Sequence, residues 1–193
     1  GRPLREVWNE WKEDERRHQE ENLAIVRQYP LTVTTPVEVD EPLGSASPLV
    51  FDSATGKAYT AMNAPGDFAH IIEIDIATGR RRKLANINGV QLYNPAFVAL
   101  DRKGQRIIFT SNNSKMRGLV VYDLQKDKVV KRKKYQRMGD IVYDNVHDYL
   151  YAIFTNGGTQ SIVRLNSELE NPEIIYAFPF GVSVFDMDVS HDD

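Results

Sequence analysis

The sequence predicts an all-β fold built from repeated sheets, preceded by one long helix, and three observations predict it. Residues 4–28 contain neither glycine nor proline and are crowded with charged side chains. From Leu31 onward the chain changes to short β-branched and aromatic runs separated by Gly, Asn and Asp. A pattern of about 45 residues then recurs, which indicates a repeat architecture.

The composition is that of a folded chain without a strong charge bias. The 193 residues are 41% hydrophobic and 10% aromatic, which is enough to form a core. The 24 basic and 27 acidic residues give a net charge of −3, so the balance gives no general reason to expect a nucleic acid or an anionic membrane as partner. Cysteine is absent, which excludes disulfides, thiolate nucleophiles and cysteine metal sites. No apolar run approaches the roughly 18 residues that a membrane span needs.

Residues 4–28 predict a single helix, which we assign to an N-terminal region 1–30. The apolar positions of its first turns follow helical spacing: Leu4, Val7, Trp8 and Trp11. We expect the helix to stop before Pro30, because a residue that precedes proline is pushed out of the α region. Each tryptophan can bury on the order of 150–250 Å², so we expect a cover, either the β region of this chain or a domain outside it.

The repeat is visible in three stretches that share an apolar strand, an Asp-led turn and a second alternating strand. These stretches are "PLVFDSATGKAYTAM", "AFVALDRKGQRIIFTSN" and "DIVYDNVHDYLYAIFTN". Their turns close on Gly56, Gly104 and Asp148, and the partial copy "FDMDVSHDD" ends on Asp193. Gly, Asn and Asp tolerate tight hairpin geometry, so we expect turns at 52–56, 101–104 and 144–148.

Each copy continues with a loop, a third strand and a fourth strand, as in "HIIEIDIATG" and "RRRKLANI". Four strands in about 45 residues are typical of a β-propeller blade, which buries both faces of its sheet only by stacking. The sequence therefore predicts a partial β-propeller with blades at about 47–90, 91–137 and 138–180, and the start of a truncated fourth blade at 181–193. We assign residues 31–46 to a linker, in which residues 32–39 are expected to form an outer strand that closes the propeller.

The repeated units resemble TolB-type propeller blades, in which a strand ends in a Ser/Asp–x–Asp–Gly turn. The stretch "LDRKGQRIIFTSN" carries the resemblance best, and "VSHDD" is similar to the next turn. The resemblance covers about 47–193 and implies the propeller fold. The departures are Asp148 where glycine is expected, one extra residue in "DSATGK", and the absence of a Trp–Ser–Pro entry to the turn.

A second resemblance covers the helix. The stretch "EVWNEWKEDERRH" is similar to the helix that closes a gluzincin-like metallopeptidase module upstream of a TolB-type propeller in some bacterial envelope proteins. This resemblance implies a periplasmic or envelope location. It also implies catalytic residues outside this chain, which has no His-Glu-x-x-His and only four scattered histidines.

Two acidic clusters are candidates for chemistry. Oxygen ligands for a hard cation occur at Asp186, Asp188, Asp192 and Asp193, beside His191. The stretch "GDIVYDNVHD" offers the groups of a general acid and base at Asp140, Asp144, His147 and Asp148. We favour the structural interpretation of both clusters as strand and turn residues, and we expect no catalytic residue, metal or cofactor in this chain.

The basic runs 80–83 and 128–137 could bind nucleic acid. Both lie on the predicted outermost strand of a blade, where lysine and arginine deter pairing with another sheet. The third copy has Pro172 and Glu173 at the same place. We therefore favour edge protection and expect no nucleic acid partner.

These features predict a non-catalytic propeller segment that serves as a protein-interaction or scaffolding module of a larger bacterial envelope protein. The alternative is the propeller portion of a metallopeptidase-linked hydrolase. The expected partner is another protein, the remainder of the same polypeptide, or an oligomer that closes the open blade edges. Loops rich in Asn and Gly lie on one face of the predicted propeller, so we expect partners to contact Asn63, Asp67, Asn112, Asn113 and Asn156.

Overall fold

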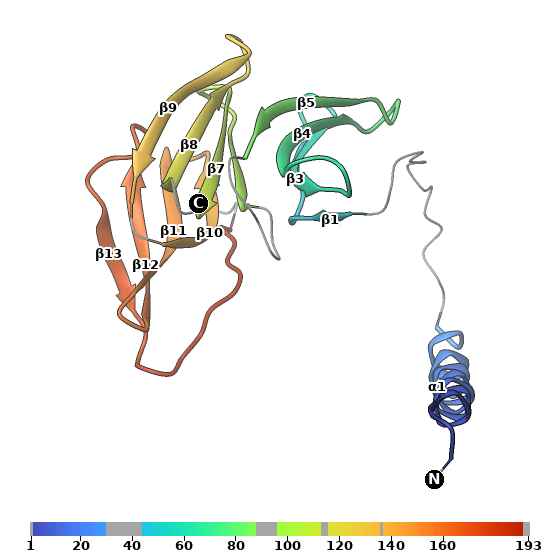
Figure 1. The fold of residues 1–193 in the computed structure, drawn as a ribbon. Helices are drawn as coiled ribbons and strands as arrows, with labels where there is room; N and C mark the ends of the chain where they lie inside the picture. Colours follow the sequence, from blue (N-terminus) through green and yellow to red (C-terminus); the bar gives the residue numbers. More distant parts are fainter. Residues whose placement is uncertain (1, 30–43, 88–95, 113–115, 136, 191–193) are drawn as a thin grey trace. The chain divides into compact units, whose positions relative to one another are not determined.

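The computed structural model describes residues 2–29, 44–87, 96–112, 116–135 and 137–190 (Figure 1). The chain divides into two units, residues 1–37 and residues 38–193. The first unit contains the helix α1, which spans Leu4–Val26, and the second contains the strands. The sequence therefore predicted correctly a helix that ends before Pro30.

The helix α1 is amphipathic but buries none of its own residues. It begins after Pro3, whose backbone is extended, and Glu6 places a negative charge in its first turn, where the helix dipole favours one. The rings of Trp8 and Trp11 stack with their centroids 4.9 Å apart. Their side chains remain about half exposed, so stacking replaces only part of the cover that we expected.

The strands of the second unit form three antiparallel sheets in chain order. The first sheet contains β1 (Ser45–Ala46), β2 (Val50–Asp52), β3 (Lys57–Asn63), β4 (His70–Asp75) and β5 (Arg81–Asn86). The second contains β6 (Val98–Asp101), β7 (Arg106–Asn112), β8 (Arg117–Asp123) and β9 (Lys128–Lys134). The third contains β10 (Met138–Asp144), β11 (Tyr149–Asn156), β12 (Thr159–Asn166) and β13 (Glu173–Ala177).

The innermost strand of the first sheet is broken into two pieces, because β1 and β2 both pair with β3. Each sheet therefore has the four-strand order that the repeat predicts. The described residues between 47 and 180 contain no helix. The described part of the stretch 181–190 forms no strand, and Asp193 and the expected closing strand 32–39 lie outside the described residues.

The hairpin between the first two strands of each sheet contains four residues: 53–56, 102–105 and 145–148. The left-handed position is occupied by Gly56, Gln105 and Asp148, with φ of +68°, +49° and +65°. The sequence alignment of Gly104 with Gly56 was therefore wrong by one residue, and the turn in "DSATGK" is no longer than the others. Gly104 has a different role, since a Cβ there would lie 2.3 Å from the Asp101 carboxylate.

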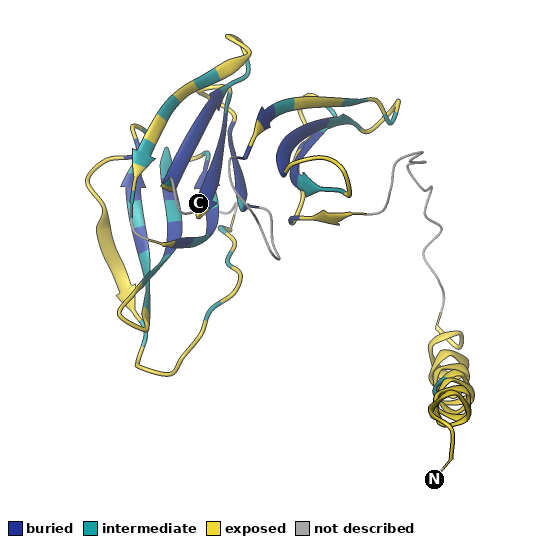
Figure 2. Cartoon of the chain, in the orientation of Figure 1, coloured by how far each residue is buried: buried dark blue, intermediate teal, exposed yellow. Residues whose placement is uncertain are grey.

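The three sheets stack through apolar cores on opposite faces of the middle sheet (Figure 2). Adjacent residues of β7 alternate between these cores, as side chains of a strand must. Ile107 joins the core between the first and second sheets, together with Ile71 of β4 and Val98 of β6. Ile108 joins the core shared with the third sheet, which includes Ile141 and Leu150. The middle sheet is thus buried on both faces.

The outermost strands β5, β9 and β13 each carry a bulge at the same place in the repeat. The extra residues are Leu84, Val130 and Ile175. Bulges and edge lysines both hinder pairing of an outer strand with another sheet. This placement of the two basic runs on outer strands agrees with the sequence interpretation.

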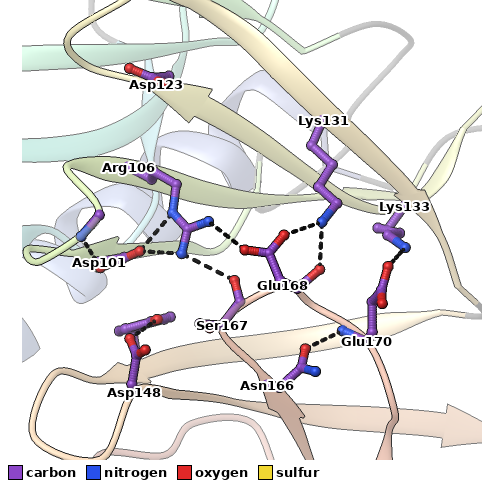
Figure 3. A network of polar contacts seen from close by, with 12 residues as sticks. Asp101, Arg106, Asp123, Lys131, Lys133, Asp148, Asn166, Ser167, Glu168 and Glu170 are labelled. Atoms are coloured by element: carbon purple, nitrogen blue, oxygen red, sulfur yellow. Dashed lines mark hydrogen bonds and ion pairs between the residues drawn. The ribbon is translucent and has the colours of Figure 1, made fainter.

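Some of the outer-strand cations also bind the next sheet. Arg82 of β5 pairs with Asp127, which lies between β8 and β9 of the second sheet. Lys131 of β9 pairs with Glu168, and Lys133 pairs with Glu170, both of which lie between β12 and β13 of the third sheet (Figure 3). These pairs are exposed to solvent, so screening by water and salt keeps their contribution to stability small.

Candidate functional site

The residues that the sequence assigned to partner contacts lie at one end of the second strands. Asn63, Asn112 and Asn156 are the last residues of β3, β7 and β11. Asp67 lies in the loop between β3 and β4, and Asn113 lies outside the described residues. The repeat therefore brings the three strand ends to equivalent places in successive sheets.

Two of these side chains are already bound within the chain. The amide of Asn112 donates a hydrogen bond of 2.7 Å to the backbone oxygen of Met138, which joins the second sheet to the third. Asp67 accepts hydrogen bonds from Lys83 and lies 3.3 Å from the ring of His70. The hydrogen bond from Lys83 holds the pKa of Asp67 below its usual range.

Asn63 and Asn156 differ from Asn112 in this respect. The side chains of Asn63 and Asn156 form no hydrogen bond with any residue that the structure describes. Asn156 is exposed, and Asn63 is half-buried. Their amides can each donate and accept hydrogen bonds, so they remain available to a partner.

The opposite ends of the sheets are tied together by residues that sequence reasoning missed. The Nε atom of Arg102 lies 3.2 Å from the carboxylate of Asp52 in the preceding sheet. The amide of Asn145 donates to the backbone oxygen of Leu100 and accepts from the backbone N–H of Arg102. Arg102 and Asn145 both follow the turn aspartate of their repeat, and that shared position was the available signal.

The turn aspartates themselves serve the backbone. Asp144 accepts hydrogen bonds from the N–H groups of Val146 and His147, and its second oxygen lies 2.9 Å from the His147 ring. Burial alone would raise the pKa of Asp144, but these donors hold it below the usual value. The carboxylate of Asp148 accepts from the hydroxyl of Tyr143. These contacts support the assignment of Asp144, His147 and Asp148 to turn geometry.

A pocket of about 330 Å³ runs along the innermost strands β2, β6 and β10 and residues 186–188. Asp140 on β10 is buried, and it accepts a 3.0 Å hydrogen bond from the backbone N–H of Met187. Burial and a hydrogen bond shared with Asp186 raise the pKa of Asp140 to about 6. One carboxyl of this pair is therefore protonated at mildly acidic pH. No group of three or more His, Asp or Glu in the described part of the chain is arranged to hold a metal ion.

The raised pKa of Asp140 predicts a pH dependence of stability. The usual pKa of aspartate in an unfolded chain is about 4, so between about pH 4 and 6 the folded chain binds the extra proton. The free energy of unfolding contributed by this group therefore falls as the pH rises through that window. The Asp140→Asn variant should lose this slope, about 1–3 kcal/mol over two pH units. Urea unfolding of both proteins at pH 4, 5, 6 and 7 measures the difference, and equal slopes would refute the assignment.

Comparison with known proteins reveals the fold. No protein-family model matches the chain, and no curated protein matches it. Among solved structures it is similar to TolB from Acinetobacter baumannii, with a TM-score of 0.56, 14% identity, and coverage of 67% of this chain and 32% of that one. A gluconolactonase from Xanthomonas campestris gives a TM-score of 0.55, 9% identity, and coverage of 75% and 50%. The structure of a putative TolB from Agrobacterium tumefaciens gives a TM-score of 0.52 and 11% identity, with coverage of 65% of this chain and 44% of that one.

The chain contains a β-propeller segment, whose fold is similar to that of the TolB structures. The identities are too low to show more than the fold, so they assign neither activity nor partner. The segment spans between a third and a half of the length of the structures to which we compare it. No described helix of the segment is long and apolar enough to cross a membrane.

Proposed function

We propose that this propeller segment is a non-catalytic protein-interaction or scaffolding module. The contrast between the two ends of the sheets carries the proposal. At the hairpin end, Arg102 and Asn145 are used to join neighbouring sheets. At the other end, Asn112 also joins two sheets, but Asn63 and Asn156 present amides that bind no described residue, on strands whose apolar residues belong to the two cores. Binding residues commonly lie on such loop ends of a rigid scaffold.

We further propose that the segment belongs to a larger bacterial envelope protein. The likeness to two TolB structures supports this placement, as does the share of their length that the segment covers. In this proposal further sheets of the same polypeptide complete the propeller. The partner then meets a face to which several sheets contribute loops.

The alternative proposal is the propeller portion of a metallopeptidase-linked hydrolase, with its catalytic residues outside this chain. It rests on the resemblance of the α1 sequence to the closing helix of such modules. No contact among the described residues favours it over the interaction module. A His-Glu-x-x-His motif upstream in the same polypeptide would support it.

Affinity purification from the native cells tests the interaction module. The bait is the full chain, and the test variant carries Asn63→Arg with Asn156→Arg. The matched control carries Ser53→Arg with Val146→Arg, which adds the same side chains to exposed hairpin positions. We expect the test variant to lose proteins that the wild type and the control both recover. Identical recovery by all three folded baits would contradict the proposal.

A further inference from the structure

A groove of about 530 Å³ lies between the second and third sheets, beside the outer strands β9 and β13. Six of its seven lining residues are apolar or aromatic; the lining is Lys134, Tyr135, Met138, Phe154, Val163, Pro172 and Ile174. Both walls belong to neighbouring sheets of the described chain. The groove therefore does not depend on what packs against the first or the third sheet from outside.

The depth of the groove is set by residues of the shared core. Met138 and Val163 are only 1% and 3% exposed and belong to the core between the two sheets. Ile174 is 62% exposed at the rim. An apolar group bound in the groove would cover the exposed side chain of Ile174, and the removal of apolar surface from water is favourable.

The equivalent place between the first and second sheets is occupied by the chain itself. Ile87 there donates its backbone N–H to Ala69, as Tyr135 donates to Arg117 in the next sheet. Ile87 is 2% exposed and is part of the apolar core. Tyr135 instead donates its hydroxyl to the backbone oxygen of Leu169, and its ring stays half-buried. Among the described residues, Ile87 is therefore buried at this position of the first gap, whereas Tyr135 lines an apolar opening in the second.

The positive charge of Lys134 at the rim of the groove indicates the chemistry of the group that would bind there. Lys131 and Lys133 of β9 are paired with Glu168 and Glu170 (Figure 3). Lys134, the next residue, lines the groove, is exposed, and forms no ion pair or hydrogen bond with the described residues. A cation beside an apolar opening is complementary to an aliphatic group that is close to a carboxylate.

We propose that this groove binds an extended segment of a partner protein in which leucine or isoleucine is followed within two residues by aspartate or glutamate. The aliphatic side chain packs against the exposed side chain of Ile174, above the floor that Met138 and Val163 form, and the carboxylate pairs with Lys134. The inference deepens the proposed interaction module by adding a second contact surface, distinct from the loop ends that carry Asn63 and Asn156. The two surfaces are tested separately.

Fluorescence anisotropy tests the groove with a synthetic probe, a fluorescein-labelled, capped peptide of sequence Gly-Ser-Leu-Ile-Asp-Leu-Asp-Ser. We expect saturable binding to the full chain with a Kd below about 100 μM. The variants Lys134→Glu and Ile174→Asp should each weaken binding by about tenfold, through charge reversal at the rim and loss of apolar contact. Lys128→Glu is the matched control, because it makes the same charge change on β9 outside the groove.

Three results would overturn the proposal. The first is a Kd above about 100 μM, or no saturable binding of the peptide at all. The second is equal weakening by Lys134→Glu and Lys128→Glu, which would show only long-range charge attraction. The third is a dimer of the free chain, seen by light scattering and abolished by Ile174→Asp, which would assign the groove to a second copy. Because the probe is synthetic, its failure leaves the purification test of the loop ends unaffected.

Discussion

Replacing Asp101 with alanine should lower the free energy of unfolding by about 3–5 kcal/mol, because it leaves a largely buried cation without its carboxylate. Asp101 is fully buried, and its Oδ2 atom accepts a 2.6 Å hydrogen bond from Nε of Arg106. Its Oδ1 atom accepts the backbone N–H of Gly104. Arg106 also donates to the backbone oxygen of Ser167, so the loss would loosen the contact between the second and third sheets (Figure 3).

Urea unfolding of the Asp101→Ala protein measures this loss. The control is Glu168→Ala, which removes an exposed carboxylate from the same network and should cost about 1 kcal/mol or less. The double variant Asp101→Ala/Arg106→Ala should cost less than the sum of its single changes, since neither charge is then left buried alone. A cost below about 1 kcal/mol for Asp101→Ala would show that this pair does not hold the hairpin.

Gly104→Ala should destabilise the chain by about 3 kcal/mol, although Gly104 does not occupy a left-handed position. A Cβ atom there would lie 2.3 Å from Oδ2 of Asp101 and 2.6 Å from Nε of Arg106. These two atoms are joined by a hydrogen bond in a buried site, so they cannot move away from the new Cβ atom without disturbing the ion pair.

Gly56→Ala in the first sheet is the matched control for Gly104→Ala. Gly56 has a φ of +68°, but a Cβ atom there would meet nothing within 4 Å. The expected cost is therefore only the backbone strain of about 1 kcal/mol. Chemical denaturation of both variants measures which substitution lowers the free energy of unfolding more. A larger cost at Gly56 than at Gly104 would show that turn conformation, rather than close approach, decides these positions.

The repeat and its strand order could be predicted from the sequence because each sheet is made from local signals. Alternating apolar residues and Asp-led turns depend on neighbours within about ten positions, and they located all three hairpins. The position of the left-handed residue in the second hairpin could not be read in this way. Gln105 takes that conformation at the fourth position of its hairpin, as Gly56 and Asp148 do, whereas the neighbouring glycine, Gly104, lies against Asp101.

The sequence could predict where the candidate site residues lie in the fold, but not which of them are bound within the chain. The ends of β3, β7 and β11 followed from the repeat, but the sequence could not separate Asn112 from Asn156. The amide of Asn112 is bound to Met138 in the next sheet, and that bond depends on how the sheets stack. The groove between β9 and β13 was missed for the same reason. Its lining residues come from five different segments of two sheets, and no local pattern joins them.

The first and third sheets stack on opposite faces of the middle sheet, as in a propeller. Methyl–methyl nuclear Overhauser effects in the isotope-labelled chain test it most directly, because Ile107 and Ile108 are adjacent in sequence but belong to different cores. Outside its own sheet, Ile107 should contact methyl groups of the first sheet, such as those of Ile71. Outside its own sheet, Ile108 should contact only methyl groups of the third sheet, such as those of Leu150. Contacts from both residues to the same neighbouring sheet, or contacts within the middle sheet alone, would contradict it.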